Sequence, residues 1–416
     1  MPPTMPPTTP ETTRPPQEPA VAAVLAHPGW AKAVATLAGE HDRTVADIVA
    51  LTEIASPPFG EEERGSAFLE MLRAHGLESV ERDATGNVMG LRRGTGEGPL
   101  LVVAAHLDTV FPAGTDVKVR REGTRLFAPG IGDDTRSLAV LLAYLRAMDA
   151  AGLRTRRDIL FVGDVGEEGL GDLRGTRALF AGAYKDRIGA FITIDSPFMD
   201  AVVTGGIGSK RYRATFRGPG GHSWGAFGLV SPSFALARAI EALGATAVPA
   251  DPRTTFSVSV LGGGTSVNAI PGEVWMEVDL RSQAPVELAR LEGRFLRLLQ
   301  EAAEAENFAR STKEGEITVE TKMIGDRPAG TTDPADPLVR IATDATQCFG
   351  FAGRHAYSST DANIPMSLGI PAVKIGSGGR GGRAHALEEW IDVEPRESVR
   401  GMAAGLATVL AAAGIV

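Results

Sequence analysis

Short, continuous apolar runs constrain the fold of this chain more than any other feature of its sequence. Residues 100–105, 159–165 and 190–194 are apolar over most of their length. Such runs are typical of strands that are buried on both faces, whereas a half-exposed strand alternates between apolar and polar residues. A helical pattern at residues 135–150 separates the first two runs. Strands that alternate with helices predict an α/β fold with a mixed, mostly parallel sheet flanked by helices, in which ligands bind at the strand ends.

The pattern changes between residues 206 and 317. Strands and helices there follow the order β-α-β-β-α, at residues 210–216, 232–243, 256–261, 273–280 and 286–305. This order predicts a self-contained α+β unit of the ferredoxin-like type. The α/β pattern then returns, with a helix at 337–347, a strand at 372–375 and a helix at 395–413. We therefore predict a discontinuous catalytic domain, residues 19–205 and 318–416, that carries an inserted domain at residues 206–317.

The composition limits the classes of protein to be considered. The proline- and threonine-rich residues 1–18 cannot bury apolar surface and are predicted to form a disordered tail. The net charge of -9 argues against nucleic-acid binding, and no run approaches the ~18 apolar residues of a membrane span. The single cysteine, Cys348, excludes an internal disulfide and a thiolate metal cluster. We expect a soluble, cytoplasmic protein with neither a nucleic-acid nor a membrane partner.

Acidic and imidazole side chains gather at the predicted strand ends. His106 and Asp108 are two residues apart, so they share a face of one strand, where a carboxylate can orient a metal-binding histidine. The other strand-end and loop candidates are Asp133, Asp134, Glu167, Glu168, Asp195 and His385. Each of these, taken alone, also has a structural explanation, such as a helix N-cap, a solvated acidic loop or a buried hydrogen-bonded pair.

Five of these residues form a nitrogen and oxygen ligand set: His106, Asp133, Glu168, Asp195 and His385. Such a set suits two divalent ions, Zn²⁺ first, with Mn²⁺ or Co²⁺ as alternatives. The three carboxylates and one bridging hydroxide would balance the charge of two dications. Outside this count, Asp108 can orient a histidine and Glu167 can carry a proton.

The motifs that contain these residues resemble those of the M20 family of metal-dependent peptidases and amidohydrolases, which includes peptidase T, glutamate carboxypeptidases and aminoacylases. They occur in the family's order between about residues 45 and 400. Besides the strand-end Asp195, they are HLDTV at 106–110, GDD at 132–134, GEEG at 166–169, GPGGHSWG at 218–225, SVNAIPGEVWMEVDLRS at 266–282 and AHALEEW at 384–390.

The resemblance implies a role for each matching residue. One metal would be bound by His106, Asp133 and Asp195. The other would be bound by Asp133, Glu168 and His385, so that Asp133 bridges the two ions. Glu167 would be the general base, and Asp108 would be the partner of His106. Many family members have a lysine where Thr135 stands in this chain.

The resemblance also implies that the inserted domain is a lid or dimerisation domain and that the protein is a homodimer. His222, in the GPGGHSWG loop, would stabilise the oxyanion, often from the neighbouring subunit. Asn268 and Arg281 match positions that contact substrate, and a planar guanidinium suits a carboxylate because it binds through two parallel hydrogen bonds. Arg380 and Arg383, in a glycine-rich loop, could add to anion recognition.

The predicted activity is cleavage of an amide or peptide bond in a small, carboxylate-bearing substrate by a binuclear metallohydrolase, with a metal-bridged hydroxide and Glu167 as the general base. The SSTDANIP segment at 358–365 also recurs in the family and makes Asp361 a candidate for substrate or structural contacts. One alternative is a non-peptidic amidohydrolase, either an N-acyl amino acid deacylase or a hydrolytic deaminase. Another is a metal-binding module without catalysis, against which the intact Glu167 argues.

Overall fold

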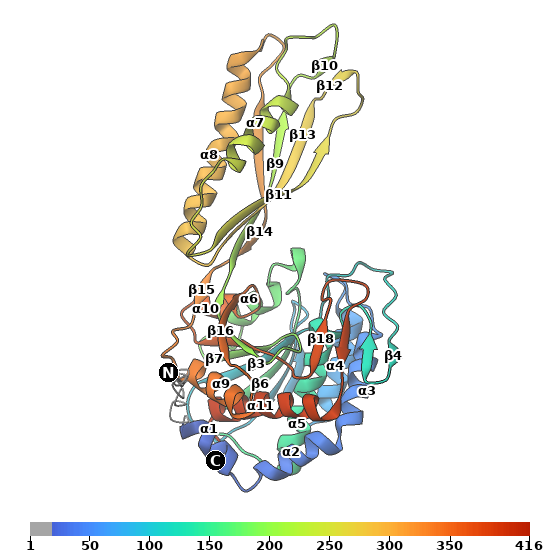
Figure 1. Cartoon of the computed structure of the whole chain (residues 1–416), viewed down its shortest axis with the longest axis vertical. Coiled ribbons are helices and arrows are strands. Elements are labelled where there is room, and N and C mark those ends of the chain that lie inside the picture. Colours follow the sequence, from blue (N-terminus) through green and yellow to red (C-terminus); the bar gives the residue numbers. More distant parts are fainter. Residues whose placement is uncertain (1–18) are drawn as a thin grey trace, which may run out of the picture.

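The computed structural model describes residues 19–416, so the tail predicted at residues 1–18 lies outside the described part of the chain. An α/β body is built on a large central sheet, and a second sheet with two long helices projects from it (Figure 1). We call this projecting unit the insert and define it as residues 208–327, from the first to the last of its four main strands.

The central sheet confirms the expected mixed, mostly parallel arrangement. Its strands lie in the order β1 (Glu78–Arg82), β2 (Val88–Arg92), β6 (Ile159–Asp164), β3 (Leu100–His106), β7 (Ile188–Ile194), β17 (Ala372–Ile375), β8 (Ala201–Gly206) and β15 (Gly330–Thr331), with β16 (Arg354–Ser358) also beside β8. The central strands β6, β3, β7 and β17 are parallel to one another. Every residue of β3 and β6 is buried, as their apolar sequences predict. The carboxyl ends of these strands meet at one edge of the sheet.

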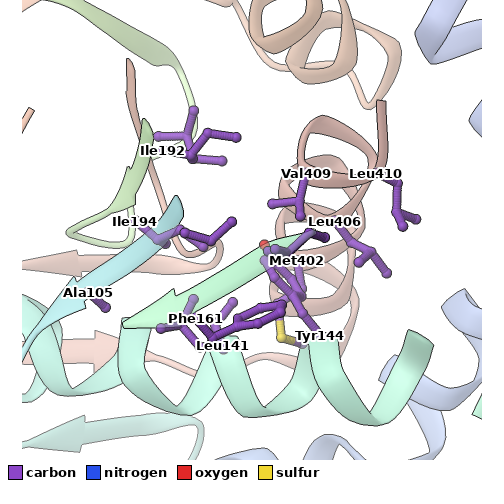
Figure 2. Packing of buried hydrophobic residues seen from close by; sticks show 14 of the residues in the cluster. Ala105, Leu141, Tyr144, Phe161, Ile192, Ile194, Met402, Leu406, Val409 and Leu410 are labelled. Atoms are coloured by element: carbon purple, nitrogen blue, oxygen red, sulfur yellow. The ribbon is translucent and has the colours of Figure 1, made fainter. Parts of the chain in front are cut away.

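Helices cover both faces of the central sheet. One layer contains α1 (Pro19–Ala26), α2 (Trp30–Gly39), α3 (His41–Thr52), α4 (Glu62–Arg73), α5 (Arg136–Ala151), α9 (Pro337–Cys348) and α11 (Pro395–Ala413), which contribute to one large apolar cluster. The other face carries α6 (Arg174–Ala181) and α10 (Asn363–Ser367). Figure 2 shows Tyr144 of α5 close to Phe161 of β6, with Leu406 and Met402 of α11 in the same cluster. Each fully buried side chain of this size stabilises the fold by about 1.5–3 kcal/mol.

The insert is an antiparallel sheet with two helices on one face. Its strands lie in the order β11 (Thr254–Gly263), β13 (Glu273–Ser282), β9 (Gly208–Arg217) and β14 (Thr318–Arg327), and its helices are α7 (Pro232–Gly244) and α8 (Pro285–Ala309). The chain order β-α-β-β-α-β is that of a ferredoxin-like unit. Because β14 pairs with β9 along its length, the inserted sheet continues through Arg327, one strand beyond the boundary expected at residue 317.

Two small sheets complete the fold. At the far end of the insert, β10 (Gly221–His222) pairs with β12 (Ala269–Ile270). Beside the central sheet, four short strands lie in the order β18 (Arg380–Gly382), β19 (Trp390–Asp392), β5 (Arg125–Phe127) and β4 (Arg120–Glu122). This second sheet joins segments that are far apart in the sequence.

Among residues 19–416, no single helix is long and apolar enough to cross a membrane. Only α1 and α2 together reach the required length and composition, and they are bent by 71° relative to each other.

Candidate metal centre

His106 is the last residue of β3 and is almost completely buried. Its Nδ1 atom lies 3.0 Å from the backbone carbonyl oxygen of Asp108, and its Nε2 atom lies 3.0 Å from Asp133 Oδ1. Because a carbonyl oxygen only accepts hydrogen bonds, Nδ1 carries a proton and Nε2 is the atom that can bind a metal. Burial alone would lower the pKa of His106, but its hydrogen bond to Asp133 and the nearby acids raise this pKa well above 6.5.

The carboxylate of Asp108 binds the loop that carries Glu167 and Glu168, and it does not bind the imidazole of His106. It accepts hydrogen bonds from the backbone N–H groups of Gly166, Glu167 and Glu168, at 2.8, 3.1 and 2.8 Å. Its Oδ1 atom lies 3.8 Å from His106 Nδ1, which is too far for a hydrogen bond. The expected pairing of His106 with Asp108 is therefore made through the backbone carbonyl, and the side chain positions the two glutamates.

Glu167 and Glu168 follow β6 and have different partners. Glu168 Oε1 lies 2.9 Å from His385 Nε2, whereas Glu167 Oε1 accepts a hydrogen bond of 3.1 Å from Nη1 of Arg327. The Nη2 group of Arg327 also donates to the backbone carbonyl of Glu167. Burial raises the pKa of Glu167 well above 4.5, and the guanidinium of Arg327 opposes this shift. Arg327, which sequence reasoning did not single out, is the last residue of β14, which follows the predicted end of the insert at residue 317.

His385 and Asp195 complete the set of predicted ligands. His385 Nε2 lies 3.2 Å from Asp133 Oδ2 as well as close to Glu168. Asp195 follows β7, and burial raises its pKa above 3.8, although the ammonium of Lys374 opposes the shift. The structure thus brings all five predicted ligand residues to the carboxyl edge of the central sheet, from loops that are far apart in the sequence.

Glu389 fixes the loop that carries Asp133. Its carboxylate accepts hydrogen bonds from the backbone N–H groups of Gly130, Gly132 and Asp133, at 2.9, 2.8 and 2.9 Å. Burial and the negative charge of Asp133 raise the pKa of Glu389 to about 7. Glu389 lies in the AHALEEW motif, from which sequence reasoning used only the histidine. The sequence feature that could have identified Glu389 is its position, four residues after the candidate ligand His385.

The histidine nitrogens and carboxylate oxygens of these residues form groups that are compact enough for each to bind one cation. Within each of three groups, one donor atom per residue lies within 4.8 Å of the others: His106, Asp133 and Asp195; Asp133, Glu168 and His385; and His106, Glu167 and Glu168. The first two groups share Asp133. Imidazole nitrogens and carboxylate oxygens without a thiolate suit Zn²⁺, Mn²⁺ or Co²⁺. Several buried carboxylates this close together also require positive charge nearby, so the residues present fit two divalent ions.

A cavity of about 550 Å³ opens onto these groups. It is lined by Asp133, Glu167, Glu168, Asp195 and His385, and by four basic residues, Arg211, Arg281, Arg327 and Lys374. Arg281 was predicted as a substrate contact, whereas the other three basic residues belong to no motif used in the sequence analysis. The insert contributes the arginines and the central sheet contributes the lysine.

The structure does not bring the remaining predicted residues to this cavity. Arg380 and Arg383 lie at the surface, where Arg383 pairs with Glu388 at 3.0 Å, and neither lines the cavity. His222 and Asn268 lie together at the far end of the insert, on the loops around β10 and β12 (Figure 1). His222 therefore lies far from the candidate metal centre of its own chain.

Comparison with known proteins agrees with the geometry. A family model described as peptidase family M20/M25/M40 matches residues 102–412. The chain belongs to this family. Membership makes the protein a hydrolase that acts on C–N bonds, and the fold is that of M20 metallopeptidases and amidohydrolases.

Solved structures share this fold across nearly the whole chain. The aminopeptidase PepT from Bacillus cereus is 22% identical, with a TM-score of 0.72 over 89% of this chain and 98% of that chain. The YXEP protein of Bacillus subtilis, described as a dinuclear metal-binding peptidase of the M20 family, is 16% identical, with a TM-score of 0.66 over 90% of this chain and 99% of that chain.

A curated relative matches over a shorter stretch. A Pyrococcus abyssi protein, provisionally named a LysW-lysine/LysW-ornithine hydrolase, is 36% identical over 138 residues. The match covers 33% of this chain and 36% of that protein, so about a third of each is aligned.

Proposed function

We propose that the protein is a binuclear metal-dependent hydrolase that cleaves an amide or peptide bond in a small substrate bearing a carboxylate. The observation that carries the proposal is the pair of ligand groups that share Asp133, since one carboxylate with two oxygens can bridge two adjacent ions. The ions, Zn²⁺ or alternatively Mn²⁺ or Co²⁺, would polarise the scissile carbonyl and lower the pKa of a water molecule.

Glu167 acts as the proton carrier in this proposal. Its carboxyl group is buried, lines the cavity and lies beside the ligand Glu168. Burial raises its pKa, so the carboxylate accepts a proton from water more readily than an exposed glutamate does. The same group then delivers that proton to the leaving nitrogen, while Arg281 binds the carboxylate of the substrate.

His222 acts in this proposal from a second subunit of a homodimer. Its Nδ1 atom accepts hydrogen bonds from the backbone N–H groups of Trp224 and Gly225, at 3.2 and 3.3 Å. A nitrogen that accepts is unprotonated, so the proton of the neutral ring is on Nε2, which can donate to a developing oxyanion. Because His222 lies far from its own metal centre, the insert of a partner subunit would supply it. We also propose a cytoplasmic location, which suits a chain with one cysteine.

The proposal is tested first by metal content and by a variant of the proposed base. Purified protein should contain two equivalents of divalent metal per chain, and a chelator should abolish hydrolysis of dipeptides, tripeptides or N-acyl amino acids. Glu167→Gln should keep the metal and lose about 10²–10⁴-fold in kcat. Full activity of this variant, or of metal-free protein, would exclude the mechanism.

The range of hydrolysed substrates separates the peptidase from a non-peptidic amidohydrolase. Peptidase T-like activity requires turnover of peptides, whereas a deacylase would cleave N-acyl amino acids and a hydrolytic deaminase would release ammonia. The fold alone does not distinguish a peptidase from a non-peptidic amidohydrolase. A hydantoinase/carbamoylase family amidase from Burkholderia ambifaria has the same fold, with a TM-score of 0.61.

A further inference from the structure

A second cavity lies in the insert, on the helical side of its sheet. Its volume is about 520 Å³, within the usual range of small-molecule sites. The end of α7, the segment that leads to β11 and the first half of α8 form its walls. Figure 1 shows this end of α8 at the base of the insert, near the catalytic body. Among residues 19–416, no residue lines both this cavity and the one at the metal centre, so the proposed chemistry does not account for it.

Most of the wall of this cavity is apolar. Leu291 of α8 is buried and lines it. The other apolar lining residues are Ala242, Ala245, Ala247, Val248 and Pro249. Two threonines also line the cavity, and their hydroxyl groups already have partners. Thr246 Oγ1 donates to the backbone carbonyl oxygen of Ala242 at 3.1 Å, and Thr254 Oγ1 lies 2.9 Å from Ser282 Oγ. The wall therefore favours an apolar group of a ligand.

Three arginines of α8 line the same cavity. Arg290, Arg294 and Arg297 are four and three residues apart, so they follow one another along one side of the helix. Like charges at this spacing destabilise a helix. The row of guanidinium groups therefore does not serve the stability of α8 itself, and it gives the apolar cavity a positively charged rim.

Two acids pair with this row, and neither is paired with Arg297. Arg290 Nη1 donates to both carboxylate oxygens of Glu287, at 2.6 and 2.8 Å. Arg294 Nη1 lies 3.6 Å from Glu301 Oε1, further along α8. Among the described residues that line the cavity, Glu287 is the only acid, and within residues 19–416 no ion pair is recorded for Arg297. The guanidinium of Arg297 is therefore available to an anion.

This cavity and the one at the metal centre lie on opposite faces of the insert sheet. Ser282, the hydrogen-bond partner of Thr254, follows Arg281 in β13. Successive side chains of a strand point to opposite faces, so Ser282 faces the helices and Arg281 faces the metal centre. Leu288 of α8 packs where the chain enters the insert, since a Cβ atom on Gly208 would lie 2.8 Å from Leu288 Cδ2. A molecule in this cavity would thus contact the elements that fix the base of the insert.

We propose that the cavity is a regulatory site for a small molecule that combines an apolar body with one anionic group, such as an aryl or alkyl carboxylate. The apolar body packs against Leu291 and the lining alanines, and the anionic group binds Arg297 and Arg294. A planar guanidinium suits such a group because it can donate two parallel hydrogen bonds. Through Thr254 and Ser282, the bound molecule shifts Arg281 and so changes the affinity for substrate at the metal centre.

A matched pair of fluorescent probes tests the binding site in full-length, metal-loaded protein. Anilinonaphthalene sulfonate and N-phenylnaphthylamine share one ring system, and only the first carries a negative charge. Fluorescence titration should give a dissociation constant about 10-fold or more lower for the charged probe. Arg297→Met should reduce this ratio toward one, and Arg297→Lys should restore part of it. Ala242→Trp, which fills the cavity, should weaken the binding of both probes.

Lys322 provides the matched control. It lies on β14, is exposed, stands opposite Arg213 of β9 and lines neither cavity. Lys322→Met removes one positive charge from the insert and should keep the wild-type ratio of the two dissociation constants. Equal affinity for the two probes, or an Arg297→Met protein with the wild-type ratio, overturns the binding site.

A kinetic measurement tests the regulatory role, and this measurement alone rests on the proposed function. Saturating anilinonaphthalene sulfonate should change KM for an amide substrate by about 5-fold or more in wild-type protein and should have no such effect in Ala242→Trp. An unchanged KM in wild-type protein overturns the regulatory role. Failure of metal-loaded wild-type protein to hydrolyse any amide overturns the proposed function instead, and the probe titrations still decide whether the site exists.

Discussion

Arg327 is the residue that connects the insert to the proposed base. Its guanidinium is buried and donates to the carboxylate and the backbone carbonyl of Glu167, and also to Ser359 Oγ at 3.1 Å. Without this cation, burial would raise the pKa of Glu167 further, which disfavours the ionised form that accepts a proton from water. We predict that Arg327→Met lowers kcat by about 10²-fold or more, while metal content is unchanged. Steady-state kinetics and elemental analysis measure the two quantities.

Two further variants separate positioning from a general loss of structure. Arg327→Lys keeps the charge and should recover part of kcat. Arg213→Met removes a half-exposed arginine of β9 that pairs with Glu277 outside the cavity, and it should leave kcat within a factor of two or so. If Arg327→Met retains full kcat, the guanidinium does not control the base.

Glu389 gives the metal-free protein a specific dependence on pH. Its pKa is raised from 4.5 to about 7 by burial and by Asp133, so the folded protein binds a proton that the unfolded chain releases between these pH values. The stability contributed by this group is therefore present below pH 4.5 and lost as the pH rises through 7. We predict that chelator-treated wild-type protein loses more unfolding free energy between pH 5 and 8 than Glu389→Gln does. Urea unfolding at each pH measures the difference, and equal slopes would contradict the assignment.

At the scale of secondary structure elements, α11 packs so closely that one of its glycines has no room for a side chain. A Cβ atom on Gly401 would lie 2.4 Å from the Cα of Gly378, in the loop that leads to β18. We predict that Gly401→Ala destabilises the fold by about 1–3 kcal/mol because a rigid backbone would have to move. A Cβ atom on Gly293, inside α8, would meet Arg297 Nη1 at 3.7 Å, an ordinary contact, so Gly293→Ala should stabilise by about 0.5–1 kcal/mol. Denaturant unfolding of both variants measures the contrast, and a Gly401→Ala protein of wild-type stability would refute it.

The elements also explain which parts of the site could be predicted from the sequence. The buried strands β3, β6 and β7 are continuous apolar runs, and the acids and histidines that follow them are therefore placed at one sheet edge. By contrast, β14 is largely exposed and polar over its first residues, so no periodicity marks it as a strand of the insert. The strands β18, β19, β5 and β4 have three residues each, too few for any period. The contact of Glu389 with Asp133, across 256 residues, depends on that small sheet.

At the scale of the whole molecule, the insert separates one predicted catalytic residue from the others. His222 lies at the far end of the insert, whereas Glu167 and the metal ligands lie in the catalytic body (Figure 1). The spacing of these residues in the sequence does not indicate which chain supplies each to a site; only the family resemblance implies that His222 often comes from the neighbouring subunit. In a symmetric dimer in which each insert reaches the partner, every complete site would combine Glu167 of one chain with His222 of the other.

Mixing two inactive variants tests this arrangement. Glu167→Gln and His222→Ala homodimers should each have strongly reduced activity. After subunit exchange, a mixed dimer contains one site with both mutations and one site with neither, because the intact Glu167 and the intact His222 come from different chains. Random pairing should therefore restore roughly a quarter of the wild-type activity per chain. If His222 instead acts within its own chain, every site in the mixture carries one mutation and no activity returns. Sedimentation of the mixture, with one variant carrying a mass tag, establishes that exchange has occurred, so a low rate in exchanged dimers counts against catalysis across the interface.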